Sequence, residues 1–287
     1  MSDQITTAFS KQYSAAVTLL AQQEMSRLRM CVATAPQVGE FQFHDQVGST
    51  TARKRTVRHA DSPYIPTPHS RKGVKMYDWD WGDYIDRQDQ VKTLIDPTNP
   101  YTRAGGAALG RAMDSEIIAA FDGNAITDDG GTVVTFANDG GTTRSVSAGG
   151  LDQAEILGIR EQFYANDVDD GEFYMAIASS QVTDLLNINQ VGSVDYNALK
   201  PLVEGKVASW MGFNFVHVSD SLLPKSGTTR SIYAWEKSGM LLAEGIEMNA
   251  RVVERSDKSF STYVYNAMSI GSVRLEGKRV IKGQITE

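Results

Sequence analysis

The sequence predicts a mixed α+β fold without an internal repeat and without a regular alternation of strands and helices. Two long stretches, residues 3–31 and 98–122, have apolar residues at three- and four-residue steps, which is typical of amphipathic helices. Strict period-two alternation occupies part of the chain between them, and long β-like runs return from about residue 246 to 285. The order of these unlike segments, rather than any single motif, predicts the fold class.

The first predicted helix covers residues 3–31, with Ser2 or Asp3 as its cap. The sequence directly after this helix contains no obvious packing partner for its apolar stripe, because a segment of different composition begins at Pro36 and Gly39. Two interpretations stay open: the helix packs on its own domain, or it is an arm that lies on a neighbouring subunit. The stripe consists of Ile5, Phe9, Tyr13, Val17, Leu20 and Leu28.

Residues 38–85 alternate in the manner of β-strands. Phe41 and Phe43 lie two residues apart, and residues 77–81 (YDWDW) alternate aromatic and acidic side chains. Because proline is confined to the edges and turns of sheets, we expect a long two-stranded excursion with a proline-rich bend. An isolated hairpin of this kind is marginal in water and requires another surface to lie on. The interrupting prolines are Pro63, Pro66 and Pro68.

Opposite charges are segregated along this excursion. Residues 51–75 carry seven basic side chains against the single acid Asp61, whereas six aspartates in residues 78–96 face only Arg87 and Lys92. Exposed pairs within one chain contribute only about 0–1 kcal/mol each. Complementary patches on separate copies instead set encounter rate and register, so the pattern predicts self-assembly. The candidate intersubunit contacts are Arg53, Lys54, Arg55, Arg58, Arg71, Lys72, Lys75, Asp78 and Asp80, with Phe9 and Tyr13 from the arm.

The second predicted helix begins after a proline-rich linker, where Thr98 or Asn99 can cap it and Pro100 fits its first turn. Gly123 is placed to end it. Its apolar face comprises Leu109, Met113, Ile117, Ile118 and Phe121. Three glycines that lower helix propensity predict close backbone packing, namely Gly105, Gly106 and Gly110.

The rest of the chain mixes strands and helices. Residues 123–150 are rich in Gly, Thr and Asp and predict a surface hairpin built from two β-like pieces, 132–136 and 142–146. An α/β pattern follows, with a loop at residues 189–196. We expect helices at about 151–165 and 179–188, and strands at about 173–178, 207–218, 231–236 and within 246–285.

Composition excludes several classes of protein. A net charge of −7 and a pI near 5.2 argue against a dedicated nucleic-acid binder and against adhesion to an anionic membrane. No stretch approaches the roughly 20 apolar residues of a membrane span, and the N-terminus lacks a secretory signal pattern. The lone Cys31 predicts a small buried hydrophobe in a reducing cytoplasm rather than a disulfide or a metal ligand.

No motif for catalysis, cofactor binding or metal binding is present. The histidines are scattered, and no GxSxG elbow, Walker loop or GxGxxG fingerprint occurs. Residues 167–172, rich in Asp, lack the ligand ladder of a calcium loop, so we expect a helix-to-strand turn. We therefore expect no enzyme, no cofactor and no metal site. The histidines are His44, His59, His69 and His217.

One catalytic alternative rests on residues 77–86. Trp79 and Trp81 with Asp78 and Asp80 have the residue types of a carbohydrate-active site, but both carboxylates project from one face of one strand instead of facing each other across a substrate. The basic segment also has no interleaved aromatic residues to stack on bases, which favours a protein partner over nucleic acid.

The order of elements resembles the major capsid proteins of tailed bacteriophages, the fold typified by phage Hong Kong 97. The resemblance covers essentially the whole chain, and its specificity lies in the order of the elements rather than in any one motif. It is carried by Phe9–Arg29 (FSKQYSAAVTLLAQQEMSRLR), Tyr84–Asp86 with Asp89, Asp96–Tyr101 (DPTNPY), and Ala107–Asp114 with Ile117 and Ile118 running into Gly123.

The resemblance implies a structural protein that assembles into hexamers and pentamers of an icosahedral shell around double-stranded DNA, bound without sequence specificity. It further implies a separate scaffolding protein, a portal and assembly in a bacterial cytoplasm. An encapsulin-like nanocompartment of the same fold is the alternative. The implied domains are an N-terminal arm (1–36), an extended loop (37–86), a peripheral domain (87–150 and 236–287, with the spine helix 98–122) and an axial domain (151–235).

Overall fold

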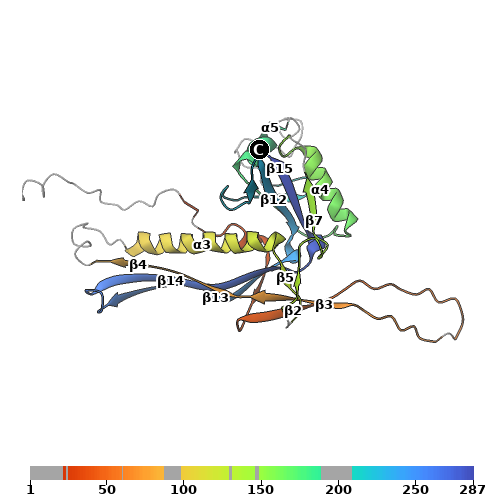
Figure 1. Ribbon diagram of the computed structural model, residues 1–287, viewed down its shortest axis with the longest axis horizontal. Coiled ribbons are helices and arrows are strands. Elements are labelled where there is room, and N and C mark those ends of the chain that lie inside the picture. Colours follow the sequence, from red (N-terminus) through yellow and green to blue (C-terminus); the bar gives the residue numbers. More distant parts are fainter. Residues whose placement is uncertain are drawn as a thin grey trace, which may run out of the picture. The chain divides into compact units, whose positions relative to one another are not determined.

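The computed structural model describes residues 22–23, 25–59, 61–86, 98–128, 131–145, 149–188 and 209–287. The chain divides into two compact units. Unit 1 comprises Met1–Ser26, Asp78–Met113 and Ile246–Ile270, and unit 2 comprises Arg27–Tyr77, Asp114–Gly245 and Gly271–Glu287. The boundary runs through α3, β13 and β14 (Figure 1).

Unit 1 is a helix packed on strands. Helix α3 (Thr98–Asp122) confirms the predicted second helix, and β14 (Ser261–Arg274) lies between β13 (Met240–Arg255) and the edge strand β4 (Tyr77–Ile85). The glycines of α3 allow close packing: a Cβ at Gly105 would lie 2.0 Å from Asn266 and 2.3 Å from Trp81, and one at Gly110 would lie 2.9 Å from the backbone of Ser26. Gly106 has ordinary space, 3.6 Å from Met248.

Unit 2 is built on a seven-stranded sheet with strand order β7-β15-β12-β8-β10-β9, and β11 pairs with β12. Strands β8 and β10 are parallel and α5 lies between them in sequence, so this unit contains a parallel crossover. The strands are β7 (Thr142–Ser145), β8 (Phe173–Ile177), β9 (Ser209–Trp210), β10 (Phe213–His217), β11 (Lys225–Ser226), β12 (Thr229–Glu236) and β15 (Val280–Thr286). The helical elements are α4 (Gln153–Ala165), α5 (Ser179–Asn187) and the 3-10 turns η2 (Lys237–Gly239) and η3 (Gly277–Arg279).

The core of unit 2 lies between this sheet and α4. The apolar face of α4 contributes Ile156, Ile159 and Phe163, which are completely buried against sheet residues such as Phe173 and Phe213. Asp152 caps α4 by accepting a hydrogen bond from the amide of Glu155 at 2.9 Å. The helices predicted at 151–165 and 179–188 and the strands predicted at 173–178, 231–236 and within 246–285 are confirmed. The region predicted at 207–218 contains two antiparallel strands, β9 and β10, and its residues 207–208, like the predicted loop 189–196, lie outside the described residues.

The charged excursion forms a second sheet of unit 2. Strands β2 (Phe41–Val47) and β3 (His69–Lys75) pair antiparallel from Phe41↔Lys75 to Val47↔His69. Strand β3 also pairs with β5 (Ala125–Ile126), which in turn pairs with β6 (Val133–Val134). This confirms a two-stranded excursion with a proline-rich bend. The YDWDW stretch is a strand, as expected, but it belongs to β4 beside β14, where Trp81 packs on Gly105.

The end of the first predicted helix is wrong. Residues 25–28 are irregular, η1 (Arg29–Cys31) is a single 3-10 turn, and β1 (Ala33–Pro36) follows and pairs in parallel with Leu241–Glu244. The amides of Arg27 and Leu28 donate to Asp114 at 3.1 Å instead of to a preceding helical turn. Phe9 and Tyr13 lie outside the described residues.

The hairpin predicted within residues 123–150 is also wrong. Strand β6 pairs with β5, whereas β7 pairs in parallel with β15 in the seven-stranded sheet. Phe136, between them, is buried and lies over Gly141, where a Cβ would be 2.3 Å from its ring. The two pieces that local composition would pair therefore belong to different sheets.

Candidate assembly contacts

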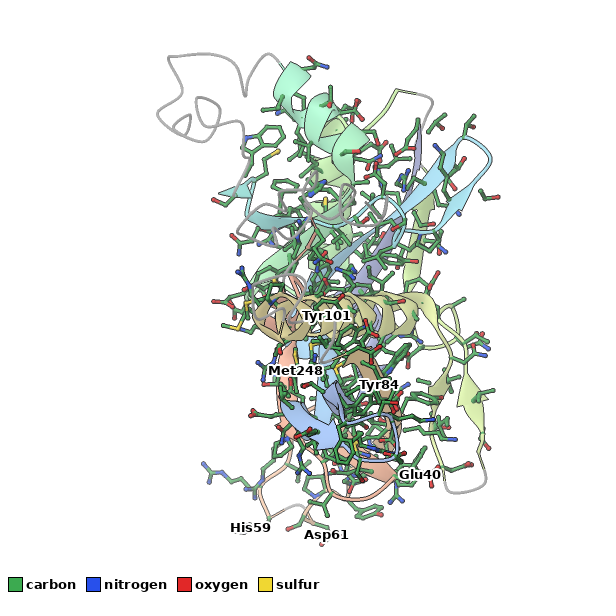
Figure 2. All side chains as sticks on the ribbon, turned by 90° about the vertical axis from the view of Figure 1, so that its left-hand side faces the viewer. Glu40, His59, Asp61, Tyr84, Tyr101 and Met248 are labelled. Carbon is green, nitrogen blue, oxygen red and sulfur yellow. The ribbon has the colours of Figure 1, made fainter. Side chains whose placement is uncertain are left out.

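The tip of the β2–β3 excursion is an exposed basic loop, defined here as residues 48–68. None of its described residues is in a helix or strand, and Figure 2 shows His59 and Asp61 at its far end. Long loops of this kind in compact proteins are usually functional. Tyr64 is 91% exposed, far more than an aromatic side chain with a partner in its own subunit. The predicted contact residues Arg53, Lys54, Arg55 and Arg58 are all exposed here.

The loop is closed tightly at its root. The amide of Gly48 donates to the carbonyl of Pro68 at 2.8 Å, and a Cβ at Gly48 would lie 2.8 Å from the Pro68 ring. Further down the hairpin, Phe41 and Phe43 lie across Gly73, where a Cβ would come within 2.4 Å of the Phe41 ring. At Gly48 and Gly73 these contacts leave no room for a larger side chain, so the two strands pack closely at the root of the hairpin.

A buried ion cluster fixes the root to the body of unit 2. The ammonium of Lys72 contacts Asp139 Oδ1, and Arg274 Nε donates to Asp139 Oδ2 at 2.9 Å. Arg274 also donates to the carbonyls of Phe121 and Gly123 at 2.7 and 3.0 Å. The side chains of Lys72 and Arg274 are 5% and 0% exposed, so one carboxylate holds two buried cations. Buried charges are tolerated only when paired in this way.

The three basic candidates of β3 therefore have different environments. Arg71 and Lys75 are exposed; they lie 3.4 Å from Asp45 and 3.6 Å from Glu40, and over the rings of Phe43 and Tyr77. Lys72 points to the opposite face, since successive side chains alternate along a strand. Its ammonium is buried in an intrasubunit contact with Asp139 and is not presented at the surface.

The acidic candidates lie on one face of β4. Asp78 and Asp80 are exposed, and Asp78 accepts a hydrogen bond from Ser269 of β14. Trp81 points to the other face, toward Gly105 of α3, and Trp79 shares that face by strand alternation. Aromatic rings and carboxylates thus project from opposite sides of the strand. This geometry gives no sugar platform beside a carboxylate pair, and it disfavours the carbohydrate-active alternative.

Two further predicted features, the buried cysteine and the turn after α4, lie within the described residues. Cys31 is buried as expected, and burial raises the pKa of its thiol to about 11. Residues 167–172 form the predicted turn, with φ of 59° at Asp167 and 126° at Gly171. Within the described ranges, no group of three His, Cys, Asp or Glu side chains could hold a metal ion, and no helix is long and apolar enough to cross a membrane.

Asp139 and Arg274 are the residues that sequence reasoning missed. Asp139 belongs to a Gly- and Thr-rich stretch that has the composition of a turn, and Arg274 follows a β run more than 130 positions away. Neither carries a local signal of burial or pairing. Long-range contacts in the folded chain alone join them to Lys72.

Comparison with known proteins identifies the family. A family model of phage capsid proteins matches residues 5–287. The capsid structure of cyanophage P-SCSP1u is similar at a TM-score of 0.75 and 14% identity, covering 99% of this chain and 94% of that one. A Mycobacterium phage Che8 structure has a TM-score of 0.69 at 14% identity, covering 96% of each chain. The cyanophage Pam1 capsid asymmetric unit has a TM-score of 0.70 at 15% identity, covering 98% and 97%. A search of curated proteins finds no match.

The structural likeness shows the fold, and the family model covers nearly the whole chain. Together they favour a phage capsid over the encapsulin-like and carbohydrate-active alternatives. The chain therefore belongs to the phage capsid protein family and is a major capsid protein of the Hong Kong 97-type fold, a structural component of the viral shell.

Proposed function

We propose that this chain assembles into hexamers and pentamers of an icosahedral shell around double-stranded DNA, with the basic loop as an intersubunit contact. A separate scaffolding protein and a portal are its assembly partners, and assembly takes place in the cytoplasm of the host bacterium. The shell holds DNA without reading its sequence, and its work is geometric rather than catalytic.

The observation that supports this proposal most is the contrast in exposure along one hairpin. The root is clamped by buried ions, whereas the basic loop is exposed and carries Tyr64 at 91% exposure. A firmly held root that presents an exposed charged tip fits a surface that binds another protein subunit. Charged side chains give such contacts specificity, and aromatic side chains give them binding energy.

The predicted domains fit the same proposal. The arm (1–36) and the extended loop (37–86) would complete their burial on neighbouring subunits. The peripheral domain (87–150 and 236–287) would supply α3 and the long strands, and the axial domain (151–235) would lie at the capsomer centre. These boundaries differ from those of the two compact units, which are cut within α3 and β14, and they stay a prediction.

Electron microscopy of the expressed protein, with and without its scaffolding protein, tests the proposal. Shells or capsomer rings are expected, and their yield should fall with rising salt because exposed charges are screened. Reversing two loop charges, Arg53→Glu with Arg55→Glu, should lower the yield and weaken its salt dependence. A monomer under every condition would refute the shell, and an unchanged yield for the double reversal would remove the loop from it.

A further inference from the structure

Residues 27–31 begin unit 2 and are held by side chains of other elements; we call them the anchor segment. The amides of Arg27 and Leu28 donate to the carboxylate of Asp114 in α3 at 3.1 Å, and Asp114 is fully buried. The indole of Trp235 in β12 donates to a carbonyl of the segment at 2.8 Å. The chain therefore enters unit 2 at a fixed point, and whatever loosens this point loosens the base of the N-terminal residues.

One contact of the anchor segment depends on a proton. Arg27 Nη1 lies 2.8 Å from Nδ1 of His217, the last residue of β10, and donates to the His217 carbonyl at 2.7 Å. A guanidinium carries donors only, so Nδ1 is the acceptor and the ring is neutral, with its proton on Nε2. Both side chains are exposed, and histidine is the side chain that ordinarily changes charge between about pH 5 and 8. The contact of Arg27 with the ring therefore exists in one protonation state only.

A carboxylate near the ring offers an alternative partner. Asp220, in the loop after β10, accepts hydrogen bonds from the amide of Ser179 at 2.9 Å and from its hydroxyl group. These bonds lower the pKa of Asp220, and the nearby charges of Arg230 and His217 lower it further. Asp220 therefore stays ionised throughout the range in which a histidine takes up a proton, and its position is fixed by Ser179.

We infer that Arg27, His217 and Asp220 form a proton-sensitive latch on the anchor segment. With a neutral ring, Arg27 is bound and the latch is closed. Uptake of a proton from water turns Nδ1 into a donor and places a second cation beside the guanidinium, while Asp220 accepts the new N–H. The anchor segment then keeps its amide bonds to Asp114 but loses the Arg27 contact, so it opens more often. The latch belongs to the single subunit and does not depend on the proposed shell.

The charged groups around the ring, among the residues that the structure describes, determine the direction of the switch. The anchor segment contributes the cation of Arg27, which touches the ring, and the loop after β10 contributes the anion of Asp220, which acts through its charge. The carboxylate of Asp114 is bound by the anchor amides. Arg230 in β12 donates to the Asp220 carbonyl and is paired with a carboxylate that follows β15. Protonation of His217 therefore opposes its contact with Arg27 and favours one with Asp220.

Hydrogen–deuterium exchange of the unassembled full-length subunit tests the latch, with rates corrected for the intrinsic effect of pH. The amides of Arg27 and Leu28 should exchange about tenfold faster at about pH 5.5 than at about pH 8 after this correction, because a hydrogen bond to a charged group is lost. His217→Gln should abolish the difference, since an amide oxygen accepts from Arg27 but takes up no proton in this range. His217→Arg should exchange fast at both pH values. His69→Gln is the matched control, because His69 is exposed on β3 and its loss should leave the difference unchanged.

Each other result overturns a defined claim. Equal corrected exchange at both pH values in the unmodified protein refutes the latch, and so does a difference that persists in His217→Gln. Slow exchange of His217→Arg at the higher pH would show that a cation at this position does not open the anchor segment. Asp220→Asn should move the transition to lower pH, because Ser179 still has an acceptor but the ring loses its anion; an unmoved midpoint removes Asp220 from the latch. If the amides of α4 follow the same pH dependence, the whole unit loses stability and the local latch is wrong.

Discussion

The root and the tip of the β2–β3 hairpin carry similar residues in opposite environments. At the root, Lys72 is buried and shares Asp139 with Arg274. At the tip, Arg53, Lys54 and Arg55 lie in the open loop. Both regions are basic in the sequence, and nothing in their local composition separates them. The difference shows that counting charges in a sequence does not by itself locate a contact surface. The charges that are paired inside the subunit must first be set aside.

The two regions should also respond to mutation in opposite ways. A buried charge that loses its partner costs stability whether or not shells form. An exposed charge costs almost nothing in the free subunit and acts only when a neighbour arrives. Substitutions at the root should therefore mainly lower the free energy of unfolding, whereas substitutions at the tip should mainly lower the yield of assembled shells. The following substitutions are ordered by their expected effect on the free energy of unfolding.

The largest effect is expected for Asp139→Ala. It leaves Lys72 and Arg274 as two buried cations without a carboxylate, and breaking a buried pair in this way costs about 3–5 kcal/mol. Urea unfolding of the unassembled subunit, followed by tryptophan fluorescence, measures the loss. Asp45→Ala is the control, because its pair with Arg71 is exposed and contributes about 0–1 kcal/mol. Equal losses for both would show that the cluster does not fix the root.

A smaller effect is expected for Gly73→Ala. The added Cβ would lie 2.4 Å from the Phe41 ring, so that ring must leave its place across the hairpin. Overpacking of this kind costs about 1–3 kcal/mol, and the exposed outer side of Phe41 allows some relief, so we expect about 1 kcal/mol. The same unfolding experiment measures it. Gly39→Ala is the comparison at a nearby glycine. Its added Cβ would meet no atom within 4 Å, but the residue has a φ of 94°, so this variant measures backbone strain without crowding.

Sequence reasoning succeeded where the signal is local and periodic. The helix at 98–122 begins and ends as predicted, and all five residues of its expected apolar face are buried, because a 3.6-residue pattern directly encodes a buried stripe. The hairpin with a proline-rich bend was predicted only in part: β2 pairs with β3, whereas the alternating residues 77–81 belong to β4 in another sheet. The three glycines of α3 were only partly predictable, since two approach a neighbour closely and Gly106 does not.

Reasoning failed where a long-range contact overrides the local pattern. Leu28 fits a helical stripe, but the amides of Arg27 and Leu28 donate to the carboxylate of Asp114 rather than to carbonyls of a helical turn. Asp78 was found by its charge, yet its hydrogen-bond partner Ser269 on β14 was not, because cross-strand pairing cannot be read from spacing alone. Such contacts depend on which strands become neighbours, a property of the whole fold.

The smallest effect on unfolding is expected at the tip, for Tyr64→Ser. The side chain is 91% exposed, so its removal should change the free energy of unfolding by less than about 0.5 kcal/mol. Shell yield should nevertheless fall, because an aromatic side chain held between Pro63 and Pro66 brings apolar area to an interface at little entropic cost. Sedimentation of assembled particles, beside urea unfolding of the free subunit, separates the two quantities. Val57→Ser, another exposed apolar residue of the loop at 64% exposure, tests whether the effect belongs to the proline-flanked site or to apolar area in general. A loss of stability without a loss of assembly would reverse the roles assigned to root and tip, because it would make the loop part of the fold of its own subunit.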